Sequence, residues 1–379
     1  KINSYERQNK MNFEELGISK NIINLLHDIG IDKPTEIQKS SIKLIKEGKD
    51  VIAESPTGTG KTLAFLLPIF ENMSENADSV QVLILSPTRE LAIQITDIAE
   101  KLGKVKKINI LSLYGGKNIG SQLKKLKGNI NMIIATPGRL LDHLRRKTVD
   151  LKSLKVLVLD EADQLLLMGF KNEIEEIIKN CSKKHQTLCF SATINSEVKK
   201  LAYKYMASPK AVTACEEETI PENIRQEIVK TTDREKQDAL CKVLDEDNPF
   251  MAIIFCRTKR RVNDLEAALY KREYNCMGLH SDIPQSKRER IMKSFRNGDI
   301  QYLIATDVAS RGLDISGVSN IYNYDIPESA RFYIHRIGRT GRAGEEGYTC
   351  LFVTPRDKNT LDEIEKGINF KIPVRKSNL

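Results

Sequence analysis

Short apolar runs alternate with longer amphipathic stretches in the first 206 residues of the chain. Apolar runs of strand length lie at 51–54, 80–86, 108–114, 131–135, 155–159 and 187–191. Helical spacing of apolar residues separates several of them, as at Glu90–Leu102 and Asn172–Asn180. Continuous apolar strands that alternate with helices are typical of parallel βαβ units with helices on both faces. The first part of the chain is therefore predicted to be an α/β domain.

The alternation stops between residues 207 and 222 and then resumes. The stretch ASPKAVTACEEETIPE carries two prolines, an acidic triplet and neither a helical nor a strand period, which predicts a linker. Later apolar runs lie at 251–256, 275–279, 301–305, 319–323 and 348–353. We expect an N-terminal domain over 1–206, a linker over 207–222 and a C-terminal domain over 223–379. Ligands of open parallel sheets bind at the carboxyl ends of the strands, where the polar motifs of both domains follow the apolar runs.

Composition narrows the class of protein. Apolar residues make up 40% and charged residues 29% of the 379 residues, which is typical of a folded, soluble protein, and no apolar run is long enough to span a membrane. The seven cysteines are scattered without a CxxC pair, so we interpret them as reduced cysteines of a cytoplasmic protein. The histidines His27, His143, His185 and His280 lack metal-ligand spacing, and we interpret them as structural or solvent-facing.

Positive charge is concentrated in the first domain. Residues 1–210 hold 33 Lys and Arg against 24 Asp and Glu, whereas residues 211–379 hold 27 of each. Within the first domain, residues 101–149 contain 12 basic residues and a single acidic one, Asp142. Such a concentration suits a polyanion such as nucleic acid, but it is equally compatible with a solvated surface, and charge alone leaves both readings open.

A glycine-rich segment between a strand and a helix predicts a phosphate site. It consists of Ser55, Pro56, Thr57, Gly58, Thr59, Gly60, Lys61 and Thr62. Glycines let backbone N–H groups turn toward phosphate oxygens, and the helix that follows adds its positive end. We expect Lys61 to bind the β- and γ-phosphates of a nucleotide and the Thr62 hydroxyl to ligate Mg²⁺. Ser55 replaces the first glycine of the strict GxxxxGK[ST] pattern.

Two further charged motifs suit the hydrolysis of a nucleoside triphosphate. Asp160 and Glu161 follow an apolar strand; we expect Asp160 to hold Mg²⁺ directly or through water, and Glu161 to act as general base on the attacking water. In the second domain, Arg336, Arg339 and Arg342 are spaced three apart, which aligns them on one face of a helix or tight turn. Such a cluster could stabilise negative charge on a γ-phosphate.

Together these segments resemble the motifs of the DEAD-box ATP-dependent RNA helicases, in family order from Phe13 to Arg342. The resemblance rests on Gly30–Gln38, Ser55–Thr62, Pro87–Ala92, Gly115–Gly116, Thr136–Arg139, Asp160–Asp163, Ser191–Thr193, Ile253–Thr258, Gln285 with Arg288, Thr306–Asp314 and His335–Arg342. It implies an α/β fold of two tandem RecA-like domains, each a mostly parallel sheet with helices on both faces.

The resemblance also implies roles for individual residues. Phe13 would stack on adenine, Gln38 would hydrogen-bond it, and Gly312 and Asp314 would contact the nucleotide, Asp314 at the ribose. Arg339 and Arg342 would reach the γ-phosphate. Asp163, Ser191, Thr193 and His335 would couple the ATP state to the RNA surface. The RNA path would be lined by Pro87, Thr88, Arg89, Gly115, Gly116, Thr136, Pro137, Gly138, Arg139, Arg257, Arg288 and Thr306.

The sequence thus predicts an RNA-stimulated ATPase that uses ATP and Mg²⁺ to close two domains on RNA and to separate short duplexes locally. Contacts to sugar and phosphate would make RNA binding largely independent of sequence. Two alternatives stay open: an RNA clamp or scaffold with slow turnover, and a DNA-directed helicase or translocase. A protein partner or a C-terminal extension missing from this chain would then select the target, and no membrane is expected as a partner.

Overall fold

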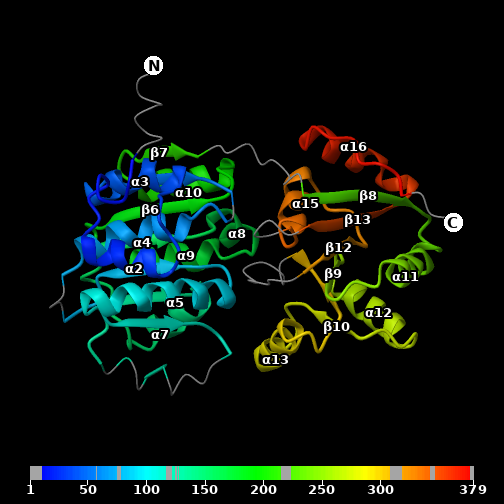
Figure 1. Cartoon of the computed structure of the whole chain (residues 1–379). Coiled ribbons are helices and arrows are strands. Elements are labelled where there is room, and N and C mark those ends of the chain that lie inside the picture. Colours follow the sequence, from blue (N-terminus) through cyan, green and yellow to red (C-terminus); the bar gives the residue numbers. More distant parts are fainter. Residues whose placement is uncertain are drawn as a thin grey trace. The chain divides into compact units, whose positions relative to one another are not determined.

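The computed structural model of the chain describes residues 11–56, 58–74, 78–116, 122–123, 126, 128–214, 223–307, 318–341 and 346–375 (Figure 1). The chain divides into two compact units, Lys1–Glu216 and Glu217–Leu379, called unit 1 and unit 2 below. Each unit contains one parallel sheet, so two α/β domains are present, as the alternation of apolar and amphipathic segments predicts.

Unit 1 is built on a seven-stranded sheet in the order β3-β4-β2-β5-β6-β1-β7. All adjacent strands are parallel. The strands are β1 Val51–Glu54, β2 Val82–Leu85, β3 Ile110–Leu113, β4 Met132–Ala135, β5 Val156–Leu159, β6 Gln186–Ser191 and β7 Lys210–Thr213. The first six fall within a few residues of the predicted apolar runs, because a strand that is covered on both faces must be apolar throughout.

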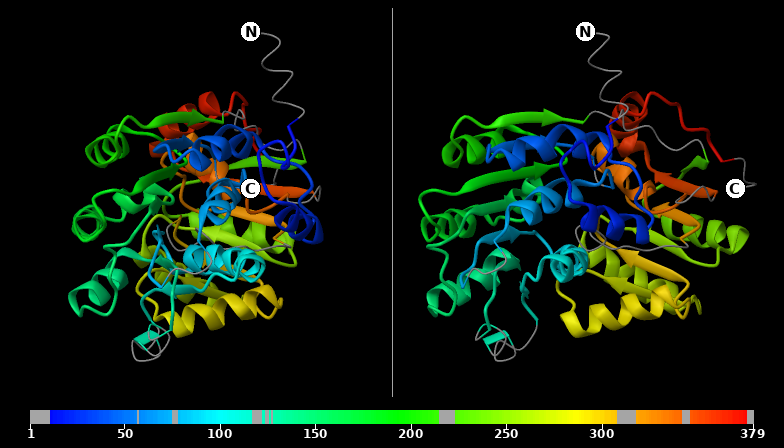
Figure 2. Two further views of the ribbon diagram at one scale, coloured as in Figure 1. Left: turned by 90° about the vertical axis from the view of Figure 1, so that its left-hand side faces the viewer. Right: turned by 60° about the vertical axis from the view of Figure 1, so that its left-hand side comes forward.

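Helices cover both faces of the first sheet (Figure 2). Alternate strand residues point to opposite faces, so Val82 and Ile84 join one core cluster and Leu83 and Leu85 the other. The first face is covered by α2 Lys20–Asp28, α3 Glu36–Lys46, α4 Lys61–Asn72 and α5 Arg89–Lys106. The second face is covered by α7 Pro137–Arg145, α8 Ala162–Leu167, α9 Lys171–Lys179 and α10 Ser196–Tyr205.

The predicted linker over 207–222 was wrong in its first part. Lys210–Thr213 form β7, which pairs in parallel with β1 and extends the sheet of unit 1. Only Val212 of this edge strand is buried, so the strand lacks the apolar run by which the others were predicted. Residues 215–222 lie outside the described part of the chain.

Unit 2 contains a six-stranded parallel sheet in the order β10-β11-β9-β12-β13-β8. Its strands are β8 Ile224–Lys230, β9 Ala252–Phe255, β10 Cys276–Leu279, β11 Tyr302–Ala305, β12 Asn320–Asn323 and β13 Gly347–Val353. One face packs on α11 Lys236–Asp247 and α12 Lys259–Tyr270. The other packs on α13 Gln285–Arg296, α15 Ala330–Ile337 and α16 Lys358–Gly367, which follows the short 3₁₀ turn η2 Pro355–Asp357.

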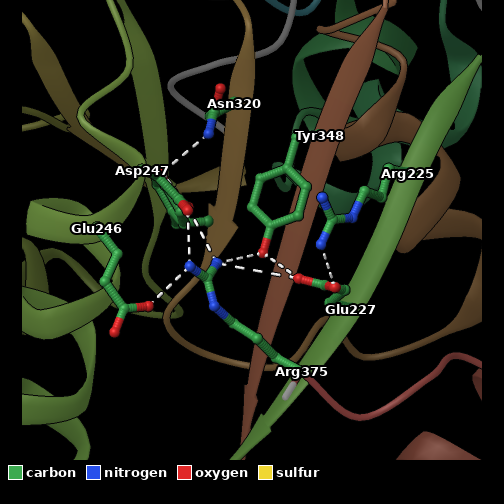
Figure 3. Close-up of polar contacts among 8 residues, drawn as sticks. Arg225, Glu227, Glu246, Asp247, Asn320, Tyr348 and Arg375 are labelled. Atoms are coloured by element: carbon green, nitrogen blue, oxygen red, sulfur yellow. Dashed lines mark hydrogen bonds and ion pairs between the residues drawn. The ribbon is translucent and has the colours of Figure 1, made fainter. Parts of the chain in front are cut away.

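The last described segment of the chain pairs with β8, the final strand in the sheet order. Ile228 donates its N–H to the Pro373 carbonyl over 2.9 Å and accepts from the Arg375 N–H over 2.8 Å. The Arg375 guanidinium then contacts Glu246 and Asp247 at the end of α11 and the Tyr348 hydroxyl on β13 (Figure 3). These contacts fix residues 373–375 against the sheet.

The six cysteines in the described part of the chain are buried and free, which agrees with reduced core residues. Burial raises the pKa of Cys189 to about 12 and so disfavours its thiolate. Among the described residues, no helix combines the length and apolarity that crossing a bilayer requires.

Candidate functional site

Polar segments follow six neighbouring strands of the first sheet. They lie at its carboxyl edge, the border at which these parallel strands end. The register pairs Leu113 with Ala135 and Ala135 with Leu85 on one side, and Leu159 with Cys189 on the other. The carboxyl ends of these strands therefore lie side by side. The segments after β3, β4 and β2 are those expected to bind RNA, and we call them the RNA half of the edge. The segments after β5 and β1 are those expected to bind ATP and Mg²⁺, and the segment after β6 is the one expected to couple ATP to RNA. We call these last three segments the phosphate half.

The phosphate loop follows β1 and ends where α4 begins. Gly58 and Gly60 have φ values of 86° and 89°, a left-handed backbone that favours glycine. Lys61 opens α4, is only 7% exposed, and donates from Nζ to the carbonyls of Ser55 and Pro56 over 2.7 and 2.8 Å. This places a buried ammonium group beside the backbone N–H groups at a helix N-terminus, an arrangement suited to a phosphate chain.

Hydrogen bonds from Gln38 and within the loop hold its two ends. The Gln38 side chain donates to the Gly60 carbonyl over 3.0 Å and accepts from the Thr35 N–H over 3.0 Å. Gly60 has a left-handed backbone, and a Cβ atom there would also meet the Gln38 amide, so the position favours glycine. At the other end, the buried Ser55 hydroxyl contacts the Thr59 hydroxyl over 2.5 Å. Gln38 therefore contacts the phosphate loop itself, while its contact with adenine stays a prediction.

Phe13 does not present a free ring. It lies in the core of unit 1 with 2% of its surface exposed, so a stacked adenine would require the residues that cover the ring to move aside. The stacking role of Phe13 stays a prediction.

The acidic segment after β5 combines a buried carboxyl group with a strained backbone. Asp160 is 3% exposed, and burial, with the neighbouring charge of Glu161, raises its pKa to about 7. Glu161 has a φ of 49°, a conformation that is uncommon for residues other than glycine and that clusters at functional sites. Asp160 Oδ1 accepts from the Glu161 N–H over 3.0 Å, which fixes the two residues relative to one another.

A second set of hydrogen bonds ties the acidic segment to the end of β6. The Asp163 N–H donates to Ser191 Oγ over 3.2 Å, and Thr193 Oγ1 donates to the Asp163 carboxylate over 3.2 Å. Ser191 Oγ also donates to the Thr193 carbonyl over 2.7 Å. Three of the four residues expected to couple ATP to RNA are thus in contact inside unit 1, while the fourth, His335, lies in unit 2.

Sequence reasoning missed one carboxylate of this half. Glu54 ends β1 and accepts a hydrogen bond from the Ile194 N–H over 3.0 Å, across 140 residues of chain. Glu54 therefore joins the strand before the phosphate loop to the segment after Thr193. A single glutamate at the end of an apolar run carries no local signal for such a contact.

The RNA half brings its three segments together. Thr88 caps α5 by accepting from the Leu91 N–H over 3.2 Å, so that Arg89 lies in the first turn. A Cβ atom on Gly115 would lie 2.8 Å from Arg89 Nη2, so the guanidinium group lies directly over that glycine. Thr136 and Pro137 begin α7, where Pro137 suits the first helical position, and place Gly138 and Arg139 in its first turn.

Much of the basic window 101–149 lies away from this edge. Lys104 and Lys106 are in the last turn of α5, about 25 Å along the helix from Arg89, and Arg145 is in the last turn of α7. Cations at helix C-termini compensate the helix dipole. These three residues thus have a role within unit 1, and both readings of the window as a whole stay open.

Unit 2 places two of its predicted residues directly after neighbouring strands. Phe255 pairs with Ala305, so Arg257 and Thr306, which follow these strands, lie at the same edge. Asp325, just beyond β12, accepts from the Arg257 N–H over 2.9 Å and from Arg261 Nε over 2.6 Å. Arg288 lies in the first turn of α13.

The three-residue spacing of the arginines predicted that Arg336 shares one face with Arg339 and Arg342, and this prediction was wrong. Its side chain is 3% exposed and donates two hydrogen bonds to Asp307 over 2.6 and 2.7 Å, and others to Asn323 and the Asp325 carbonyl. Arg336 is thus bonded inside unit 2 and does not share an anion-binding face with Arg339. Helix α15 ends at Ile337, so Arg339 lies beyond it, while His335 lies in its last turn.

Four predicted site residues lie outside the described part of the chain: Thr57, Gly312, Asp314 and Arg342. Among the residues that the structure describes, no three His, Cys, Asp or Glu side chains form a metal cluster. This does not conflict with the predicted Mg²⁺ ligands, because Mg²⁺ is commonly held by one or two protein oxygens together with phosphates and water.

Comparison with known proteins identifies relatives over almost the whole chain. Residues 35–201 match the profile of the DEAD/DEAH box helicases, and residues 235–344 match that of the helicase conserved C-terminal domain. The ATP-dependent RNA helicase CshA of Limosilactobacillus reuteri is 47% identical over 94% of this chain and 72% of that protein. The DEAD-box ATP-dependent RNA helicase CshA of Bacillus subtilis is 44% identical over 93% of this chain and 72% of that protein.

Solved structures agree with the fold. S. cerevisiae Dbp5 bound to RNA and ADP BeF3 superposes with a TM-score of 0.85 at 31% identity, over 96% of this chain and 95% of that chain. The expectation of two tandem RecA-like domains is confirmed.

Proposed function

Because this chain belongs to the DEAD/DEAH-box helicase family, we propose that it is an ATP-dependent RNA helicase. The observation that supports the proposal is that the segments expected to bind ATP and those expected to bind RNA follow neighbouring strands of one sheet, with Asp163, Ser191 and Thr193 in contact. In the proposal, the site for the triphosphate and the site for the polynucleotide share this sheet.

In the proposed reaction, the phosphate half binds ATP and directs a water molecule at its γ-phosphate. Lys61 binds the β- and γ-phosphates, and Glu161 accepts the proton of the water, which its strained position beside Asp160 supports. Thr62 and Asp160, directly or through water, would hold Mg²⁺, whose charge neutralises the phosphate oxygens when it is bound. The buried Asp160 carboxyl group beside the Lys61 loop fits this hard-oxygen ligand set.

We propose that unit 2 completes the site when the two units close. Arg339 and Arg342 then stabilise the charge that develops on the γ-phosphate, and Asp314, with Gly312, contacts the nucleotide. Arg257, Arg288 and Thr306 bind the RNA backbone together with the RNA half of unit 1. ATP and RNA each favour the closed state, so each tightens the binding of the other. Hydrolysis reopens the units after one short stretch of duplex has separated.

The proposed partners and location follow from the same chemistry. RNA contacts through sugar and phosphate are independent of the RNA sequence. The natural RNA target would therefore be selected by a protein partner or by a C-terminal extension. The buried, free cysteines support a reducing compartment, and we place the protein in the cytoplasm.

Steady-state ATP hydrolysis with RNA, with DNA of the same sequence and without nucleic acid tests the proposal. We expect strong stimulation by RNA alone, together with separation of short RNA duplexes. Equal stimulation by DNA would instead establish a DNA-directed enzyme. ATP-dependent RNA binding without multiple turnover would establish a clamp.

A further inference from the structure

A buried network of side chains lies behind the RNA half of unit 1. Gln122 is 3% exposed; its Oε1 accepts from Arg139 Nη1 over 2.9 Å and lies 3.1 Å from His143 Nε2. Its Nε2 donates to the Tyr114 carbonyl over 3.2 Å. The buried His143 ring also contacts the Thr148 hydroxyl through Nδ1 over 2.9 Å. We call these five residues the Gln122 network.

The chemistry of the neighbours fixes the orientation of the Gln122 amide in this network. An arginine side chain only donates and a backbone carbonyl only accepts, so the Gln122 amide has a single orientation. Gln122 therefore presents an oxygen to His143, and His143 Nε2 carries the hydrogen. The Thr148 hydroxyl lies 2.9 Å from Nδ1 and also donates to the His143 backbone carbonyl over 3.0 Å, so this hydroxyl holds both the ring and the backbone of His143. Burial, and secondarily Arg139, lowers the pKa of His143, which agrees with a neutral ring.

The network joins two RNA segments that are far apart in the chain. Tyr114 directly precedes Gly115 and Gly116, whereas Arg139 lies in the first turn of α7. The Gln122 amide hydrogen-bonds both the Tyr114 carbonyl and the Arg139 side chain. His143, one turn further along α7, contacts the oxygen of the same amide. The distance and angle between the glycine pair and the Arg139 guanidinium are therefore set by Gln122.

We propose that Gln122 and His143 are positioning residues for RNA binding, which orient Arg139 toward the sugar–phosphate backbone of a single strand. This inference rests on the proposed function, since it assumes that Arg139 binds RNA. An arginine that is only partly buried has many rotamers, and holding it in one of them reduces the entropy lost on binding. Helix α7 does not need the network for its packing, because Leu140 and Leu141 already anchor it in the core.

The first test compares two buried glutamines of unit 1. In Gln122→Ala we expect the RNA concentration that half-saturates ATP hydrolysis to rise roughly tenfold, with a maximal rate that falls less than about twofold. Gln81→Ala is the matched control, because Gln81 is equally buried and donates to the Ser74 carbonyl, but lies at the amino end of β2. The control should leave RNA half-saturation unchanged. Equal shifts in both variants would overturn the proposal.

A double-mutant cycle separates positioning from a general loss of structure. If Gln122 acts through Arg139, the variant with both Gln122→Ala and Arg139→Ala should bind RNA within about threefold of Arg139→Ala alone. Effects that multiply in full would show that Gln122 acts independently and would overturn the proposal. His143→Phe keeps the ring volume and removes the bond to Gln122, so it should give a smaller shift of the same kind and serves if Gln122→Ala does not fold.

The same data distinguish failure of this inference from failure of the proposed function. If Arg139→Ala weakens RNA binding and Gln122→Ala does not, the positioning role is wrong and the function stands. If RNA does not stimulate ATP hydrolysis by the wild-type protein, the proposed function itself is wrong.

Discussion

The two halves of the carboxyl edge in unit 1 hold their charges in opposite ways. In the phosphate half, Lys61, Asp160 and Asp163 are buried, and Glu161 adopts a left-handed backbone. In the RNA half, Arg89 and Arg139 stay partly exposed, and neighbouring groups define their orientation. The electrostatic interaction between a charged side chain and a reacting group is stronger where water is excluded. A charged side chain that binds the backbone of a long polymer must instead remain accessible to that polymer. Substitutions in the phosphate half should therefore change rates, and substitutions in the RNA half should change affinity.

The largest expected effect is that of Glu161→Gln. Removing the general base should lower the maximal rate of ATP hydrolysis about 10²–10⁴-fold, while ATP still binds. Glu273→Gln is the matched control, because Glu273 also has a left-handed φ of 64° but lies in unit 2 after α12. Comparable turnover in Glu161→Gln and wild type would remove Glu161 as the base.

Lys61→Ala should lower the maximal rate by roughly 10²–10³-fold, because it removes a buried cation from the phosphate site. Lys106→Ala, at the far end of α5 in an ion pair with Glu71, should change the rate less than twofold. Rapid RNA-stimulated hydrolysis by the Lys61 variant would contradict the role assigned to this residue.

Asp160→Asn should stabilise unit 1 above neutral pH, while hydrolysis slows because a predicted Mg²⁺ ligand is lost. A carboxyl group whose pKa rises from 3.8 to about 7 on folding binds more protons in the folded state, so its ionisation destabilises the fold increasingly between these pH values. The substitution removes that cost, on the order of 2–4 kcal/mol at pH 8 without metal or nucleotide. Denaturant unfolding from pH 4 to pH 8 should show a difference from wild type that widens up to about pH 7. A constant difference would mean that Asp160 is already ionised at low pH.

Arg89→Ala should have the smallest effect on rate. The RNA concentration for half-saturation should rise roughly tenfold at an almost unchanged maximal rate, and the slope of log affinity against log salt should fall by about 0.7, as for one phosphate contact with a single strand. Arg146→Ala, an exposed arginine in an ion pair with Asp142 at the far end of α7, is the control and should change neither quantity. If Arg89→Ala lowered the maximal rate instead, the division of the edge into two halves would be wrong.

The sequence was sufficient to predict the strands and motifs that have a local pattern of apolar and polar residues. Apolar runs located six of the seven strands of unit 1, and the parallel arrangement then placed Ser55–Thr62 beside Asp160 and Ser191. Two edge strands escaped detection, because β7 buries only Val212 and β8 carries Arg225, Gln226 and Glu227 in its middle. The edge strands β3 and β10 were predicted, so local pattern fails where an edge strand lacks a continuous apolar run.

Contacts between distant residues were beyond the reach of the sequence. Arg336 has the same spacing as Arg339 and Arg342, and only the fold shows that Asp307 binds it. His143 was interpreted as structural or solvent-facing because it lacks metal-ligand spacing. Its partner Gln122 lies 21 residues earlier, so no local pattern indicates their contact. The left-handed backbone of Glu161 likewise depends on the strand and helix between which it is held.

The short segment 373–375 has a consequence for how the second sheet meets other chains. It pairs with Ile228 of β8, and Arg375 locks it against α11 and β13. An edge strand with unpaired backbone N–H and C=O groups can pair with a strand of a second molecule, which is a common route to self-association. Cutting the chain before Pro373 would uncover that edge, so shortened versions of the protein should aggregate more readily than chains that retain Arg375.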